Sequence, residues 1–147
     1  NKAPNVKVVA GVTRKNEVAN GTIHTVSKVI LHQNWSRQLV VHDIALLKLS
    51  TPIIFNGEAV PICLPNANQP IPNNGRAVAT GFGAHNVPGT HQNVSDGQLR
   101  EVVVPIVAPE ICDKYTNEEW RRTKLICASS KDRGTYAGDS GGPLMMK

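Results

Sequence analysis

Long apolar stretches are missing from this sequence, and their absence excludes one class of protein. No run of about eighteen apolar residues occurs, and a helix needs roughly that many to cross a bilayer. We therefore expect no membrane span. Internal repeats and heptads are missing as well, which excludes repeat arrays and coiled coils.

Two kinds of binding pattern are also missing. Only three cysteines are present, none of them at Cys-x-x-Cys spacing, so neither a zinc site nor a thioredoxin-type motif is predicted. The net charge of +5 is diffuse. Because no basic stripe with interleaved aromatic residues appears, we expect no nucleic-acid partner.

The abundant residues favour strands. The 147 residues include 17 Val, 10 Ile and 9 Thr against 9 Leu, and β-branched side chains fit pleated strands better than helices. Twelve glycines and ten prolines punctuate the chain at short intervals. This composition predicts an all-β fold with many turns and a modest core.

Strands are expected where apolar residues gather between turn residues. The expected strands are Lys7–Gly11, Thr25–Leu31, His42–Leu49, Ala59–Leu64, Arg76–Gly81, Leu99–Val107 and Leu125–Ala128. Pro105 suits an edge strand or a bulge. One short helix is expected from Pro109 to about Tyr115, with the proline in its first turn. Residues 65–75, rich in Pro and Asn, are typical of a linker.

The most distinctive local pattern surrounds Ser140. Residues 138–142, Gly-Asp-Ser-Gly-Gly, satisfy the G-x-S-x-G pattern of the α/β-hydrolase nucleophile elbow. That elbow needs a helix after the serine, then an acid and a histidine. Here Pro143 follows, and no Asp, Glu or His remains before Lys147, so this fold is rejected. On these residues alone, an idle serine in a glycine-rich turn stays the alternative.

A longer set of motifs resembles the chymotrypsin-like (trypsin-family, S1) serine endopeptidases. GDSGGPL, residues 138–144, resembles the family's nucleophile motif, and HDIALLKL, residues 42–49, resembles the strand that carries its triad aspartate. Three more segments are similar to family motifs and follow in the family's order. These are VPICLP at 60–65, TGFG at 80–83 and LICA at 125–128.

The resemblance implies an all-β, two-barrel fold that is incomplete at both ends in this chain. Residues 1–65 are expected to be the C-terminal part of the first barrel and residues 66–76 the interdomain linker. Residues 77–147 are expected to be the N-terminal part of the second barrel, with the nucleophile motif. No metal and no cofactor is implied.

The resemblance also assigns roles to single residues. Ser140 is the expected nucleophile, and Asp43 the carboxylate that orients a histidine base. Backbone N–H groups of Gly138 and Ser140 are expected to hold the oxyanion. Asp139 is expected to pair with the new amino terminus after zymogen cleavage. Gly134, six residues before the nucleophile, is expected in the substrate pocket.

The base itself is not expected among the histidines of this chain. In the family it precedes the segment that matches Val8–Gly11, whereas every histidine here follows that segment. On a strand, moreover, His42 and Asp43 would point to opposite faces. All five are expected to be solvated or structural: His24, His32, His42, His85 and His91. We therefore expect a fragment that lacks its catalytic histidine and is inactive alone.

The cysteines are also interpreted through the resemblance. In the family, the positions of Cys112 and Cys127 form a disulfide, and the position of Cys63 is often bridged to a segment outside this one. Two positions at which family cysteines usually pair hold Ala77 and Met146, so that bridge is absent. Tyr136 replaces a further cysteine, which predicts a looser pocket rim.

The pocket residue predicts what is cut. Trypsin-like members carry an aspartate where this chain has Gly134, and that aspartate binds Lys or Arg side chains. A buried cation without a counter-charge is costly, so an apolar or small residue before the scissile bond is predicted. Asp132 is the alternative source of negative charge.

Three N-x-S/T sequons, together with the cysteines, favour an oxidising compartment and a secreted, extracellular glycoprotein. They begin at Asn20, Asn34 and Asn93. The expected function is a secreted serine endopeptidase acting through an acyl-enzyme, with protein or peptide substrates, an activating protease and serpin-type inhibitors as partners. One alternative is a non-catalytic homologue with a binding or regulatory role. Another, resting only on the +5 charge, is a heparin- or carbohydrate-binding β domain.

Overall fold

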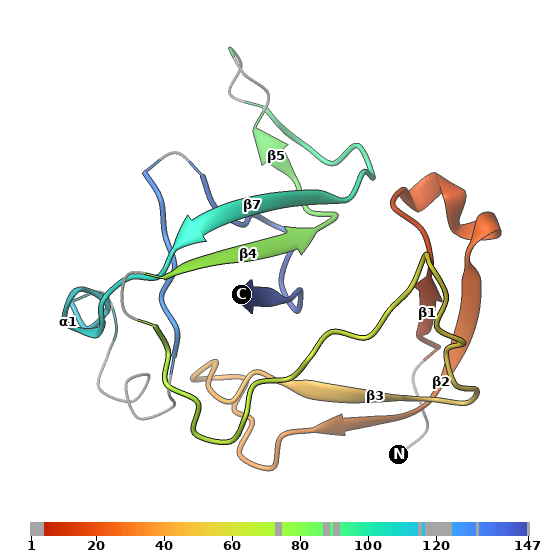
Figure 1. Ribbon diagram of the computed structural model, residues 1–147, viewed down its shortest axis with the longest axis horizontal. Coiled ribbons are helices and arrows are strands. Elements are labelled where there is room, and N and C mark those ends of the chain that lie inside the picture. Colours follow the sequence, from red (N-terminus) through yellow and green to blue (C-terminus); the bar gives the residue numbers. More distant parts are fainter. Residues whose placement is uncertain are drawn as a thin grey trace. The chain divides into compact units, whose positions relative to one another are not determined.

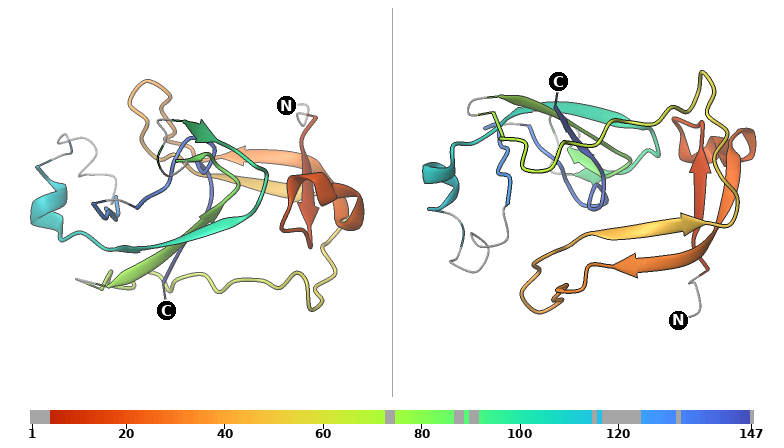
Figure 2. Two further views of the ribbon diagram at one scale, coloured as in Figure 1. Left: turned by 90° about the horizontal axis from the view of Figure 1, so that it is seen from above. Right: turned by 60° about the horizontal axis from the view of Figure 1, so that its bottom comes forward.

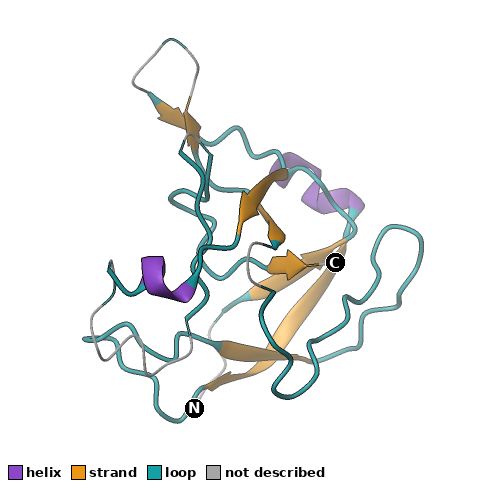
Figure 3. Ribbon diagram, turned by 60° about the vertical axis from the view of Figure 1, so that its left-hand side comes forward, coloured by secondary structure: helices purple, strands orange, loops and turns teal. Residues whose placement is uncertain are grey.

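A computed structural model describes residues 5–72, 75–86, 89, 92–114, 116, 125–131 and 133–146. The chain divides into two compact units, Asn1–Pro65 and Asn66–Lys147. Within the described residues, strands dominate and helix is confined to two short segments (Figure 3). No helix in these ranges is long and apolar enough to span a membrane.

The first unit is built on a three-stranded antiparallel sheet in the order β1–β2–β3 (Figure 1). The strands are β1 (Lys7–Ala10), β2 (Thr22–Leu31) and β3 (Ala45–Leu49), and the 3-10 helix η1 (Lys15–Asn20) joins the first two. The long strand β2 pairs through its first half with β1 and through its second half with β3. Figure 2 shows this sheet from two further sides.

Few side chains of the first unit are buried. Among its described residues these are Val26, Val41 and His24. His24 is held by two hydroxyls, because its Nδ1 lies 3.3 Å from Thr51 Oγ1 and its Nε2 lies 3.2 Å from Thr22 Oγ1. On β3, by contrast, Leu46 is 65% exposed. The apolar pattern therefore predicts this strand, but not its burial.

The second unit contains a three-stranded sheet in the order β7–β4–β8 and a two-stranded hairpin of β5 and β6 (Figure 1). The bounds are β4 (Arg76–Gly81), β5 (His85–Asn86), β6 (Asn93–Val94), β7 (Arg100–Pro105) and β8 (Leu144–Met146). All pairings are antiparallel. Pro105 ends the edge strand β7, as the sequence predicts.

The core of the second unit lies along the middle strand. Ala77 is fully buried and is paired with Val104 on one side and with Met146 on the other. Ala79, two residues on, is also buried, as the alternation of a strand requires. Ala77 and Met146 stand where the resemblance implies a pair of cysteines. The two residues are cross-strand neighbours and form no disulfide.

The third strand begins later than predicted. The sequence favours a strand from His42, but β3 starts at Ala45. Val40 and His42 have φ angles of +51° and +54°, and left-handed backbone cannot continue a strand. His42 and Asp43 therefore precede the strand, and strand alternation does not place their side chains on opposite faces. The His42 ring instead stacks on His32, with centroids 4.6 Å apart and planes 5° apart.

Two other predicted strands are wrong. Ala59–Leu64 forms no strand, because Pro61 lacks the N–H that a ladder needs. Leu125–Ala128 contributes only an isolated bridge between Ala128 and Ile106.

The predicted helix forms as α1, Pro109–Cys112, with the proline at its start. Tyr115, where that helix was predicted to end, lies outside the described residues. Cys112 is bonded to Cys127 with a Cα–Cα distance of 5.9 Å, while Cys63 is free and exposed.

Removing the disulfide should destabilise the protein measurably. The bond closes a loop with a sequence separation of 15, for which chain entropy gives about 3 kcal/mol. We expect the Cys112→Ser, Cys127→Ser double variant of the full-length protein to lose that much free energy of unfolding in urea titrations. Cys63→Ser is the matched control and should shift it by less than about 0.5 kcal/mol. Equal free energies of unfolding for the wild-type protein, the double variant and Cys63→Ser would contradict the prediction.

Candidate active site

Ser140 lies in a tight turn just before β8. The backbone N–H of Asp139 donates to the Tyr136 carbonyl at 3.0 Å, and that of Gly142 donates to the Asp139 carbonyl at 2.9 Å. Gly138 and Gly141 have φ angles of +98° and +84°, a region that is costly for residues with a Cβ. The glycines thus let the chain turn sharply on both sides of a serine that is exposed to solvent.

The carboxylate of Asp139 anchors this turn. Its Oδ1 accepts a hydrogen bond from the Gly83 N–H at 2.8 Å, and its Oδ2 accepts one from the Tyr136 N–H at 2.9 Å. A Cβ at Gly83 would lie 2.5 Å from this carboxylate, and one at Gly81 would also overlap it. The two glycines of the TGFG motif therefore provide the space in which Asp139 is held.

Two backbone donors beside the serine are unused. Within the described part of the chain, the N–H groups of Gly138 and Ser140 donate no hydrogen bond. Unpaired N–H groups on either side of Asp139 can together bind an oxygen that gains negative charge during a reaction. The turn thus combines an exposed hydroxyl with two free donors.

Asp43 lies in the first unit, in the segment that leads into β3. Its side chain is exposed, and among the described residues its carboxylate has no hydrogen-bond partner. A tight turn precedes the strand, with the Ile44 N–H bonded to the His42 carbonyl at 2.8 Å. A carboxylate in this state is free to accept a hydrogen bond from an imidazole N–H.

Gly134 lines an open cavity of about 930 Å³ in the second unit. Other lining residues include His85, Glu101, Lys131 and Tyr136. A Cβ built at Gly134 meets no atom within 4 Å, so this position has room for a larger side chain. Asp132, the alternative source of charge, lies outside the described residues.

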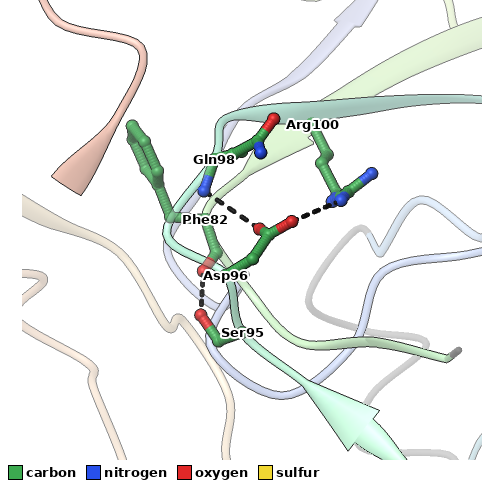
Figure 4. A network of polar contacts seen from close by, with 5 residues as sticks. All are labelled: Phe82, Ser95, Asp96, Gln98 and Arg100. Carbon is green, nitrogen blue, oxygen red and sulfur yellow. Dashed lines mark hydrogen bonds and ion pairs between the residues drawn. The ribbon is translucent and has the colours of Figure 1, made fainter. Parts of the chain in front are cut away.

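A polar network fixes the chain where it returns to β7 (Figure 4). Asp96 accepts hydrogen bonds from the Gln98 N–H at 3.1 Å and from Arg100 at 2.6 Å. The hydrogen bond from the Gln98 N–H has the largest effect on this carboxylate. Together with the bond from Arg100, it holds the pKa of Asp96 below its usual value. Ser95 Oγ donates to the Phe82 carbonyl at 3.1 Å, so the network reaches the TGFG segment that holds Asp139.

One contact near the site has no signal in the sequence. The Tyr136 hydroxyl accepts a hydrogen bond from Asn93 Nδ2 at 3.1 Å. The family resemblance marks Tyr136 only as a replacement for a cysteine, and nothing in the local pattern points to Asn93 as its partner.

Among the described residues, no histidine is hydrogen-bonded to this turn. His85 lies in β5, and its Nδ1 is buried without a partner among the described residues. His91 lies outside the described residues. No group of three or more His, Cys, Asp or Glu side chains that could hold a metal ion occurs in the part of the chain that the structure describes.

Comparisons with known proteins agree on one family. The family model described as Trypsin matches residues 1–147. The chain is 36% identical over 137 residues to clotting factor G beta subunit of Tachypleus tridentatus, covering 86% of this chain and 43% of that protein. It is 39% identical over 132 residues to Trypsin-1 of Astacus astacus, covering 88% of this chain and 52% of that protein.

A solved structure has the same fold. The structure of GrC matches with a TM-score of 0.80 and 27% identity, covering 96% of this chain and 62% of that chain. The chain spans about half the length of the two curated relatives described above. The all-β, trypsin-like fold expected from the motifs is thereby confirmed.

Proposed function

This chain belongs to the trypsin family of serine proteases, and we propose that the protein containing it is a secreted endopeptidase that cleaves peptide bonds through an acyl-enzyme. The observation that carries the proposal is the Ser140 turn. There an exposed hydroxyl shares one turn with two unpaired backbone donors, the N–H groups of Gly138 and Ser140. An idle serine needs no such arrangement. The presence of this serine also gives no support to a non-catalytic homologue.

The proposed reaction uses groups of both units. Ser140 Oγ attacks the scissile carbonyl carbon while a histidine outside these residues takes its proton, and Asp43 orients that histidine. The carbonyl oxygen becomes negative and accepts hydrogen bonds from the Gly138 and Ser140 N–H groups. The histidine then protonates the leaving amine, and water releases the acyl group from the serine.

Asp139 is the proposed switch between zymogen and enzyme. Both its hydrogen bonds come from neutral backbone N–H groups, those of Gly83 and Tyr136, so its negative charge lacks a charged partner among these contacts. We propose that an activating protease creates an amino terminus whose ammonium pairs with it. The proposed barrels remain residues 1–65 and 77–147, joined by 66–76, and the division of the chain after Pro65 supports this boundary.

Secretion is proposed on three observations. One similar protein is named as a clotting factor subunit. Cys112 and Cys127 form a disulfide, which persists in oxidising compartments. All three sequon asparagines are exposed, which suits a glycoprotein. Protein substrates and serpin-type inhibitors are the proposed partners.

Covalent labelling tests the proposed function. A fluorophosphonate phosphonylates an activated serine and releases fluoride, whereas an idle hydroxyl does not react. In the full-length activated protein, we expect peptide mapping to find the label on Ser140. The unactivated form is the control and should label far more slowly. If Ser140 stays unlabelled after activation, the proposal is wrong.

Substrate preference is expected to follow Gly134. Chromogenic peptides that differ only in the residue before the scissile bond should be hydrolysed best when that residue is apolar or small. Because a cation buried without a counter-charge is unfavourable by several kcal/mol, Gly134→Asp should raise kcat/KM for Arg peptides by about a hundredfold.

Gly134→Ala is the matched control for this test, because it adds volume without charge and should give no such gain. A wild-type enzyme that prefers Arg peptides, and that gains nothing from Gly134→Asp, would contradict the prediction. Loss of that preference in Asp132→Asn would then identify Asp132 as the source of the charge.

A further inference from the structure

Tyr136 joins two parts of the second unit that lie far apart in sequence. Its hydroxyl accepts the hydrogen bond from Asn93 in β6 at 3.1 Å, and its backbone N–H donates to Asp139 Oδ2 at 2.9 Å. The residue thus connects the β5–β6 hairpin with the carboxylate that anchors the Ser140 turn.

No disulfide cross-links the segment that contains the Ser140 turn. Residues 133–147 contain no cysteine, and the disulfide of the second unit joins Cys112 to Cys127 instead. The short strand β8 follows the turn and pairs with β4 through only three residue pairs, from Leu144 to Met146. Among the described contacts, the hydrogen bonds of Asp139 to Gly83 and Tyr136 hold the turn.

We infer that Tyr136 is a positioning residue for the proposed peptidase, and that it acts through its hydrogen bond to Asn93. This inference rests on the proposed function. Without the bond, the half-exposed Tyr136 side chain is free to change rotamer, and its backbone N–H no longer stays aligned with Asp139. The carboxylate then leaves Gly83, and the N–H groups that would bind the oxyanion lose their orientation.

The first test compares variants of the full-length activated protein. We expect Tyr136→Phe to lower kcat for peptide hydrolysis about fivefold, the effect of one neutral hydrogen bond, with KM changing less than twofold. Asn93→Leu should cause the same loss. The double variant should lose no more than either single variant, because both changes remove one bond.

Asn93→Asp is the matched control. Its carboxylate accepts a hydrogen bond from the Tyr136 hydroxyl, so the connection persists with donor and acceptor exchanged. The change also removes the sequon, and so separates the hydrogen bond from any glycan on Asn93. We expect wild-type kcat within twofold. If Asn93→Asp loses as much as Asn93→Leu, the inference is wrong.

Amide hydrogen exchange gives a readout that does not depend on catalysis. In Tyr136→Phe and Asn93→Leu, the amides of Gly83 and Tyr136 should exchange about fivefold faster, because the turn opens more often. The amide of Val78 in β4 should not change. Unchanged exchange at Gly83 and Tyr136 would overturn the inference. If exchange rises as expected but even the wild-type protein cleaves no peptide, the proposed function fails and the structural connection stands.

Discussion

Replacing Ser140 with alanine should lower kcat for peptide hydrolysis by the full-length activated protein about a million-fold. The hydroxyl is the proposed nucleophile, and without it no acyl-enzyme can form. Stability should hardly change, because the side chain is exposed and makes no hydrogen bond among the described residues. Steady-state kinetics with a chromogenic peptide and urea titration measure the two effects.

Ser129→Ala is the control for this experiment, since Ser129 is another exposed serine of the second unit. It should keep wild-type kcat. A Ser140→Ala protein that retained more than about a thousandth of wild-type kcat would show that another group is the nucleophile, because loss of a triad serine costs far more.

Asp43→Asn is expected to have the second-largest effect, a loss in kcat of about ten-thousand-fold. An amide in place of the carboxylate stabilises the wrong tautomer of the histidine and does not stabilise its protonated form. The exposed position of Asp43, two residues before β3, makes the change tolerable for folding. Kinetics on the full-length activated protein measure the loss.

Glu58→Gln is the control, because Glu58 is an exposed carboxylate of the same unit and should not affect kcat. If Asp43→Asn lowered kcat less than about tenfold, another carboxylate would orient the base. The family resemblance would then hold for the fold but fail for this residue.

Much of the fold was predictable because its signals are local. β4 has the predicted bounds, since a β-branched and alanine-rich segment lies between a glycine and the TGFG turn. The start of α1 was predicted from Pro109. The start of β3 was not predictable, because the left-handed backbone just before it includes Val40, a β-branched residue that rarely adopts this conformation.

The site was predictable only in part. Motifs indicated Ser140, Asp139 and Gly138, because glycines and a serine at fixed spacing are visible in the sequence. The contacts that hold them were not visible. The bond from Gly83 to Asp139 joins residues 56 positions apart, and the bond from Asn93 to Tyr136 joins residues 43 positions apart. Such pairs depend on how the strands assemble, which local patterns do not encode.

We expect the pairing of strand β8 to determine when the Ser140 turn forms during folding. Ala77 in β4 pairs with Val104 in β7 and with Met146 in β8. The chain segment that separates Ala77 from Met146 is much longer than the segment that separates it from Val104. Each doubling of loop length costs roughly 0.6 kcal/mol more to close, and pairings distant in sequence form slowly. We expect pulse-labelled amide exchange during refolding to show β7 protected before β8. A partly folded chain would then carry no assembled Ser140 turn until β8 pairs with β4.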